Sequence, residues 1–167
     1  MKIESIITLI NTGKENKSLY ESSSANLLEL VQCNDSPERI LNSIDELLKA
    51  ENWEELNNRF HTNLKFGTGG MRGRTIGNTI TESERGNSNK NQSPQFAAVG
   101  SNTLNEITVV RATKALFLHI KKWLAEDGIL AQPRLVIAYD VRHFSEKFCK
   151  LSALIWSKFC FLYTSPS

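Results

Sequence analysis

The chain has 167 residues, of which 40% are hydrophobic, and these values exclude a disordered chain, a coiled-coil rod and a large multidomain enzyme. The 20 basic and 18 acidic side chains leave a formal net charge of +2, so we expect neither a nucleic-acid partner nor a membrane partner. No apolar run approaches the roughly 20 residues of a transmembrane helix. Three cysteines without CxxC spacing predict a reducing, cytoplasmic location.

The first 60 residues predict an arm followed by a helical extension. Residues 1–24 are rich in Ser, Asn and Lys after the first turn, which predicts a weakly ordered arm. Ser36 and Pro37 predict a helix start, with Ser as the N-cap and Pro at the first helical position. The apolar residues that follow have helical spacing, and they are Ile40, Leu41, Ile44, Leu47 and Leu48. A second short helix is predicted over residues 52–60.

The densest glycine cluster follows a short strand candidate at residues 64–66. It reads Gly67-Thr68-Gly69-Gly70-Met71-Arg72-Gly73-Arg74. Glycines let backbone N–H groups approach an anion closely, and an arginine binds phosphate through two parallel hydrogen bonds. The spacing matches neither GxGxxG nor the GxxxxGK[ST] P-loop. Two interpretations therefore stay open, a phosphate site and a plain tight turn.

The next two segments predict a loop and a long helix. Residues 81–94 are polar and predict a surface loop, longer than most loops of compact domains. Residues 105–124 return to helical spacing. The residues expected on the apolar side of that helix are Val109, Ala112, Leu116, Ile120, Trp123 and Leu124.

A continuous apolar run at residues 135–139 predicts a buried parallel strand. The sequence Asp140-Val141-Arg142-His143-Phe144-Ser145 follows it, and another helix is predicted from Ser145 onward. The carboxyl end of a parallel strand faces the ligand crevice in open α/β sheets. Asp140 and Arg142 are therefore either ligand-binding residues or a surface ion pair, with Ser145 as the N-cap of the helix. The order of strand, helix, strand and helix predicts an α/β domain.

Taken together, two of these segments resemble motifs of the α-D-phosphohexomutases, the phosphoglucomutase and phosphomannomutase family. Residues 64–73 are similar to the family pattern Phe-Gly-Thr-small-Gly-apolar-Arg-Gly, and residues 136–145 to an apolar strand that ends in Asp-x-Arg-x-x-Ser. Asn105 before the long helix is also similar to the family. The resemblance covers residues 37–158 approximately, and it is specific because both motifs stand in the family's order around a helix.

The resemblance implies a fold and a division into domains. The fold would be an α/β/α layered sandwich with a mixed, mainly parallel sheet, preceded by an N-terminal helical extension. Residues 1–60 would be the arm and helical extension, residues 61–158 a truncated first domain of a phosphohexomutase, and residues 159–167 an aberrant or incomplete C-terminal tail. We expect the end of the sequence, from Phe159 onward, to be a truncation or a misread frame.

The resemblance also implies an activity, an intramolecular phosphotransferase. The intact enzyme would interconvert hexose 1-phosphate and hexose 6-phosphate through a phosphoserine and a hexose 1,6-bisphosphate, with Mg²⁺ as cofactor and glucose 1,6-bisphosphate as intermediate or activator. Arg72 would support catalysis beside the phosphoserine. The residues implied in substrate binding are Thr68, Gly69, Gly70, Arg72, Asp140 and Arg142.

This sequence also departs from the family. It has no Ser-His-Asn-Pro motif for the catalytic serine and no aspartate-rich metal loop, and Phe144 replaces a residue that is often polar. We therefore expect no metal ligands in this chain, no mutase activity from it alone, and the downstream domains of the same enzyme as its missing partners. The alternative is a non-catalytic α/β module that binds a sugar phosphate. The unmatched glycine spacings disfavour a third class, a nucleotide-binding domain.

Overall fold

The computed structural model describes residues 2–33, 36–129 and 134–159. It divides the chain into two compact units, unit 1 (Met1–Asn105) and unit 2 (Glu106–Ser167). The predicted first domain of residues 61–158 therefore includes parts of both units. The predicted tail lies outside the described residues, except for Phe159.

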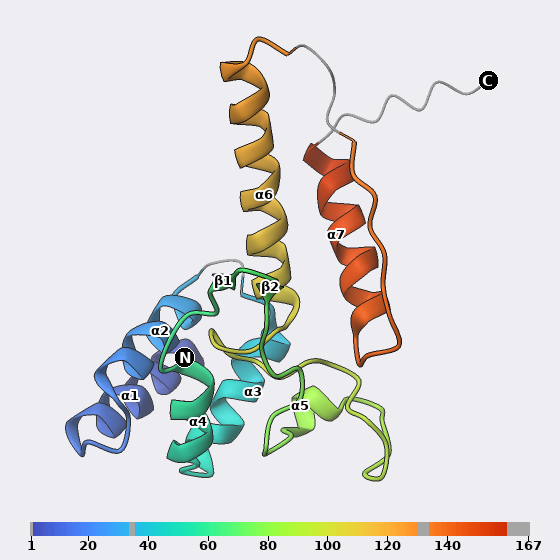
Figure 1. The fold of residues 1–167 in the computed structure, drawn as a ribbon. Coiled ribbons are helices and arrows are strands. Elements are labelled where there is room, and N and C mark those ends of the chain that lie inside the picture. The colour runs from blue at the N-terminus through green and yellow to red at the C-terminus, as the bar shows by residue number, and fades with distance from the viewer. Residues whose placement is uncertain (1, 34–35, 130–133, 160–167) are drawn as a thin grey trace. The chain divides into compact units, whose positions relative to one another are not determined.

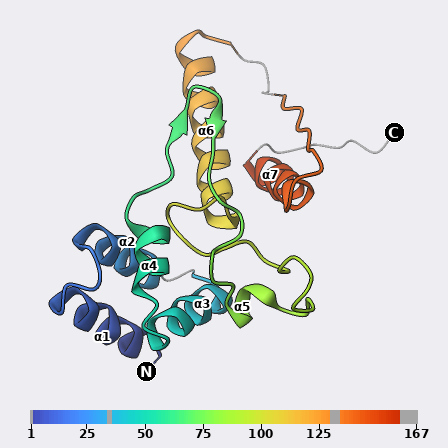
Figure 2. The same ribbon diagram turned by 60° about the horizontal axis from the view of Figure 1, so that its bottom comes forward.

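Unit 1 begins with four helices, α1 (Lys2–Glu15), α2 (Glu21–Val31), α3 (Glu38–Lys49) and α4 (Trp53–Phe60) (Figure 1). Helix α1 packs on α2 and α3, and α4 packs on α2 and α3. Figure 2 shows the four helices grouped together. Their apolar faces form the core, whose fully or almost fully buried members include Ile6, Ile10, Leu27, Val31, Ile44, Leu47, Leu48, Leu56 and Phe60.

Helix α1 lies where the sequence predicts a weakly ordered arm, so that prediction is wrong. Ile6 and Ile10 are four residues apart and therefore share one face of α1, where both are fully buried. Gly13 lets the end of α1 approach α4, because a Cβ at this position would lie 2.7 Å from the Trp53 ring. Tertiary packing thus supports a helix whose own apolar stripe is short.

Helices α3 and α4 confirm the two helices predicted after Pro37, with one difference at the start of α3. Pro37 is the N-cap residue and Glu38 the first helical residue, whereas the Ser36 hydroxyl donates to the Leu30 carbonyl at 2.6 Å. At the start of α4, the Asn52 side chain accepts a hydrogen bond from the Glu55 N–H at 3.2 Å. All five residues of the predicted apolar stripe of α3 are buried.

The rest of unit 1 contains little regular structure. Strands β1 (Phe66–Gly67) and β2 (Gly70–Met71) form an antiparallel hairpin. Helix α5 (Glu82–Arg85) begins at a capping box made by Thr81 and Glu84, and it packs on α3. Thr81 and Glu84 are 4% and 1% exposed, so the predicted surface loop at residues 81–94 begins with a buried, ordered turn.

Unit 2 contains helices α6 (Glu106–Glu126) and α7 (Ser145–Phe159), which pack against each other and confirm the two predicted helices. Their contact centres on Phe117, whose ring lies edge-on to Trp156 at 5.3 Å and stacked on Phe159 at 5.2 Å. Although α6 has 21 residues, none of the helices in the described part of the chain is long and apolar enough to cross a membrane.

The predicted α/β/α sandwich with a mixed, mainly parallel sheet is wrong. Of the residues that the structure describes, 56% are helical and 4% are in strands, and these strands form one sheet of two strands. Residues 135–139, predicted as a buried parallel strand, form neither a strand nor a helix, and Val136 is 94% exposed. A parallel strand exists only through hydrogen bonds to a neighbour. No strand within the described ranges provides that neighbour.

Candidate functional site

The hairpin of β1 and β2 brings four of the predicted site residues together. Phe66 pairs with Met71 and Gly67 with Gly70, which leaves Thr68 and Gly69 as the turn. Gly70 adopts a φ of +104°, a conformation that residues with a Cβ rarely adopt, and the space where its Cβ would lie is open. The turn therefore exposes backbone to solvent on a side where no side chain blocks it.

The guanidinium of Arg72 lies close to this turn. A Cβ on Gly69 would lie 3.0 Å from Nη2 of Arg72, so the guanidinium lies directly beside the Gly69 backbone. The Arg72 side chain is exposed, and it makes no hydrogen bond or ion pair with another residue of the described ranges. A guanidinium carries five N–H donors in a fixed fork, which suits a phosphate. The turn and Arg72 together can therefore receive an anion from solvent.

The base of the hairpin is held on both sides by residues 101–104. The Leu64 N–H donates to the Ser101 carbonyl at 2.8 Å, and the Leu104 N–H donates to the Arg74 carbonyl at 2.8 Å. Gly73 lies in the narrow space between these contacts, where a Cβ would be 2.9 Å from the Leu64 side chain and 3.1 Å from the Leu104 nitrogen. Substitution of Gly73 by a residue with a side chain would therefore displace the hairpin from residues 101–104.

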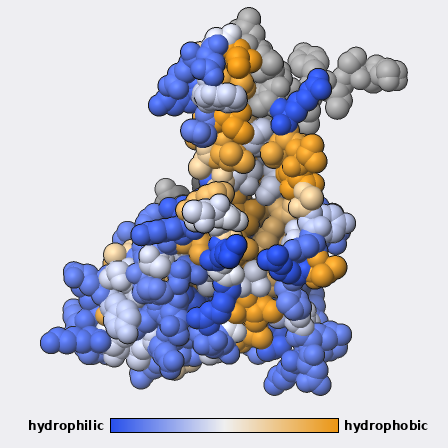
Figure 3. All heavy atoms as spheres, in the orientation of Figure 1, coloured by the Kyte–Doolittle hydropathy of each residue, from blue (hydrophilic) through white to orange (hydrophobic). Residues whose placement is uncertain are grey.

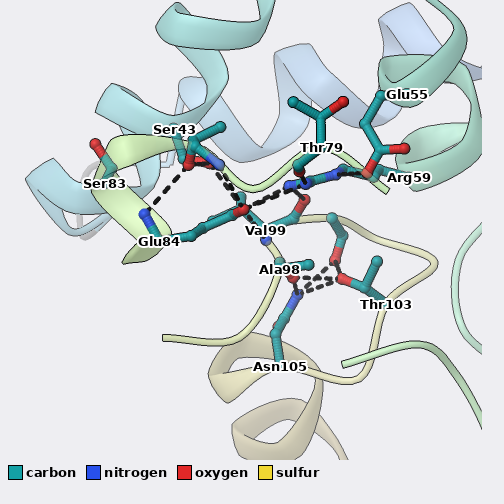
Figure 4. A network of polar contacts seen from close by, with 12 residues as sticks. Ser43, Glu55, Arg59, Thr79, Ser83, Glu84, Ala98, Val99, Thr103 and Asn105 are labelled. Carbon is teal, nitrogen blue, oxygen red and sulfur yellow. Dashed lines mark hydrogen bonds and ion pairs between the residues drawn. The ribbon is translucent and has the colours of Figure 1, made fainter. Parts of the chain in front are cut away.

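Buried polar side chains fix residues 98–105 in turn (Figure 4). The Asn105 side-chain amide donates to the Ala98 and Gly100 carbonyls at 3.1 and 2.8 Å, and to the Thr103 hydroxyl at 2.9 Å. The Thr103 hydroxyl donates to the Ala98 carbonyl at 2.7 Å. Asn105 is 1% exposed, so its role in this structure is to close a loop.

Beside this loop lies a buried ionic network that we call the Arg59 network, formed by Arg59, Glu55 and Glu84 (Figure 4). Nε of Arg59 donates to Glu55 at 2.7 Å, and its two terminal nitrogens donate to the Glu84 carboxylate. The same carboxylate accepts the Ser43 hydroxyl at 2.9 Å and the Val99 N–H at 2.8 Å. The network therefore ties α3, α4 and α5 to the loop that supports the hairpin.

The single cation of the Arg59 network is compensated by two buried carboxylates. Arg59, Glu55 and Glu84 are 2%, 3% and 1% exposed. Burial lowers the pKa of the Arg59 guanidinium, but the hydrogen bonds and charges of Glu84, and then those of Glu55, outweigh that effect and raise the pKa above its usual value. The guanidinium stays charged and out of reach of a ligand, so the network acts as support rather than as a reactive site.

We did not predict the Arg59 network from the sequence, although two signals point to it. Glu55 and Arg59 are four residues apart on one helix, the spacing of an ion pair. Thr81-Glu82-Ser83-Glu84 has the pattern of a capping box, and both of its reciprocal hydrogen bonds are present. Neither signal shows that the two pairs meet in the core, because Arg59 and Glu84 are far apart in the sequence.

Asp140 and Arg142 lie in unit 2, where they form a local turn before α7. Nε of Arg142 contacts Asp140 at 2.9 Å, and its backbone N–H donates to the same carboxylate at 3.0 Å. The Arg142 N–H, the Ser145 hydroxyl and the Arg142 charge lower the pKa of the Asp140 carboxyl. This geometry matches the surface ion pair that the sequence left open. Ser145 is not the N-cap but the first residue of α7, and its hydroxyl accepts a hydrogen bond from the Asp140 N–H at 3.1 Å.

The predicted site residues therefore form two local clusters. Thr68, Gly69, Gly70 and Arg72 meet at the hairpin of unit 1, and Asp140 and Arg142 meet at the turn of unit 2. The described residues contain no group of three or more His, Cys, Asp or Glu side chains that could hold a metal ion. They therefore do not fit the Mg²⁺ that the resemblance implies for the intact enzyme.

Comparison with known proteins adds no family to these observations. No protein-family model matches the chain, and no curated protein or solved structure matches it either.

Proposed function

We propose that unit 1 binds the phosphate group of a hexose phosphate at the hairpin, as the N-terminal part of a protein of the phosphohexomutase type. This proposal rests on the position of the Arg72 guanidinium, which lies beside the Gly69 backbone on an exposed turn with open space at Gly70. The motif that resembles the phosphohexomutases supports the choice of a hexose phosphate over other anions.

In this proposal Arg72 supplies the charge and the turn supplies the shape. The guanidinium would bind two phosphate oxygens in parallel, and the Thr68 hydroxyl and the glycine N–H groups would donate further hydrogen bonds. Arg72 would hold the phosphate in a fixed orientation, and it would neutralise negative charge on the group in a transfer reaction. Residues 66–72 contain no serine, so a phosphoserine would have to come from another part of the protein.

Titration of glucose 1,6-bisphosphate into the ¹⁵N-labelled chain tests the proposal. We expect the amide signals of Gly69 and Gly70 to shift on binding, and unphosphorylated glucose to leave them unchanged. The variant Arg72→Ala should bind at least about tenfold more weakly, because a hydrogen bond to a charged group contributes roughly 1.5–3 kcal/mol. Arg111→Ala, an exposed position on α6, is the matched control and should bind like the unmodified chain.

Three results would contradict the proposal. They are hairpin amides that do not respond, an Arg72→Ala variant with unchanged affinity, and ATP or NAD that binds more tightly than the hexose bisphosphate. A coupled assay for glucose 6-phosphate then separates binding from turnover. The sequence contains no Ser-His-Asn-Pro motif, so we expect binding without turnover from this chain.

A further inference from the structure

Residues 134–139 form an open backbone edge in unit 2, which ends where the Asp140 N–H donates to Ser145. They run as an extended chain along α7 (Figure 1), and they belong to neither a helix nor a strand. Val136, Ile137 and Tyr139 favour strands by residue type. Val136 and Tyr139 are 94% and 59% exposed. In Figure 3, apolar side chains also lie over α6 and in the region of α7.

One contact distinguishes the two edges of this segment. The Cys149 thiol of α7 donates to the Ile137 carbonyl at 4.0 Å. The N–H and C=O of one residue in an extended chain point to the same edge, and those of its neighbours point to the opposite edge. The backbone groups of Val136 and Ala138 therefore point away from Cys149. No residue of the described ranges makes a hydrogen bond to them.

The charges at the two ends of the segment are complementary to those of a second, antiparallel copy of the same segment. In an antiparallel pair centred on Ile137, position 136 lies opposite 138, 135 opposite 139, and 134 opposite 140. Arg134 of each copy then faces Asp140 of the other. Arg134 is exposed, and the Asp140 side chain is 49% exposed. Asp140 already binds Arg142 in its own chain, but a carboxylate has room for a second cation.

We propose that two copies of this chain associate through residues 134–140 as a two-fold antiparallel β-pair. Val136 of one copy and Ala138 of the other exchange both of their backbone hydrogen bonds, and Ile137 faces its own equivalent across the axis as a non-hydrogen-bonded pair. Opposite charges meet at both ends, and apolar residues meet between them. A foreign strand would satisfy the backbone groups equally well, but a copy of this segment is known to bring both charge pairs with it. The inference is independent of the proposed phosphate site.

Cysteine cross-linking of the full chain tests the register. Cys33, Cys149 and Cys160 are first replaced by serine, which keeps a donor at position 149, and Ile137→Cys is then added. The two Cα atoms at position 137 should lie about 4.5 Å apart, within the roughly 4.4–6.8 Å that a disulfide spans. A mild oxidant should therefore convert the variant to a covalent dimer.

The matched control is Val136→Cys in the same background. Its two copies lie diagonally across the axis, about 7–8 Å apart, which is too far for a disulfide without backbone movement. We expect at least tenfold slower cross-linking than for Ile137→Cys. Equal rates at the two positions, or no cross-link at position 137, would overturn the proposed register.

Sedimentation of the otherwise unmodified chain tests the association itself. We expect a monomer–dimer equilibrium that Arg134→Glu shifts at least tenfold toward monomer, because like charges then face each other at both ends of the pair. Arg111→Glu makes the same change of charge on α6 and should leave the equilibrium unchanged. A chain that stays monomeric at all concentrations, or a dimer that is unaffected by Arg134→Glu, would overturn the proposal. The second result would place the interface on another apolar face.

Discussion

The two units of this chain differ in whether their polar groups have hydrogen-bond partners. In unit 1, Arg59 is 2% exposed, and every terminal nitrogen of its guanidinium has an acceptor within the core. In unit 2, the backbone of Val136 and Ala138 has no hydrogen-bond partner in the described part of the chain, although the segment is apolar. The Arg59 guanidinium and the backbone N–H and C=O groups of Val136 and Ala138 are all polar, and burying such groups without hydrogen-bond partners costs free energy.

The difference shows what a unit needs in order to be complete by itself. Unit 1 has four packed helices that form a core large enough to bury a salt bridge with all its hydrogen bonds. Unit 2 has one helix pair, which buries Phe117 and Trp156 and leaves large apolar residues such as Leu118 and Val141 exposed. A strand-forming segment beside one helix pair has no sheet to join. We therefore expect substitutions to act in different ways in the two units.

The largest effect is expected when the Arg59 network loses its cation. Arg59→Met leaves the Glu55 and Glu84 carboxylates buried without a positive charge, which costs about 3–5 kcal/mol in the free energy of unfolding. Urea denaturation followed by circular dichroism measures this loss as a lower midpoint. Arg72→Met removes the same charge from an exposed position of unit 1 and should change the free energy by less than about 0.5 kcal/mol. Equal effects of the two substitutions would show that the network does not support unit 1.

A somewhat smaller effect is expected from Trp156→Ala in unit 2. Trp156 is 7% exposed and packs on Phe117, so its removal should cost about 3 kcal/mol, the lower end of the values for large aromatic residues. Hydrogen exchange of the α7 amides measures the loss locally. Trp123→Ala is the control, because Trp123 is 51% exposed and its removal should leave exchange almost unchanged. If both variants exchange alike, the helix pair is not held by Phe117 and Trp156.

A moderate effect is expected from Gly77→Ala. The new Cβ would press on the Arg59 guanidinium and on the Glu55 carboxylate, both of which are buried and cannot swing away. Overpacking of this kind costs about 1–3 kcal/mol. Gly67→Ala is the control, since its Cβ would meet only the Gly70 carbonyl at 3.6 Å. Thermal unfolding of the two variants should therefore differ clearly, and equal midpoints would argue against a rigid Arg59 network.

The smallest effect is expected from acidification at the turn before α7. The folded chain lowers the pKa of Asp140, so the turn is stabilised above the carboxyl's ordinary pKa of 3.8, and this stabilisation is lost as the pH falls through the lower, folded value. The Arg142 amide, which donates to this carboxylate, should report the transition in an NMR titration. In Asp140→Asn the transition should be absent. A midpoint at or above 3.8 in the unmodified chain would contradict the geometry of the turn.

The elements with strong local signals could be predicted from the sequence. The stripe from Ile40 to Leu48 predicts α3, and the spacing from Val109 to Leu124 predicts α6, because both patterns follow the helical period. The predicted inner face of α6 is less accurate. Thr113 and Phe117 are buried, whereas Leu116 and Trp123 are about half exposed. The period predicts a helix, but the position of its partner α7 decides which side is buried.

The elements that depend on distant partners could not be predicted. Residues 135–139 have the composition of a buried strand, but composition does not supply a neighbouring strand. The Arg59 network joins residues 25 positions apart, Arg59 and Glu84, and no local pattern relates them. At the candidate site, the glycines of the hairpin predict a turn correctly. The position of Arg72 over Gly69 required the structure, because it depends on a side-chain conformation.

Native-state hydrogen exchange of the dilute, full chain tests the contrast between the units most directly. We expect slow exchange for Val99 and Leu104 in unit 1, whose amides donate to Glu84 and to Arg74. We expect almost unprotected exchange for Val136 and Ala138, with protection that rises as the protein concentration rises. Fast exchange at Val99 and Leu104, or protection at Val136 and Ala138 that does not depend on concentration, would contradict this contrast between the units.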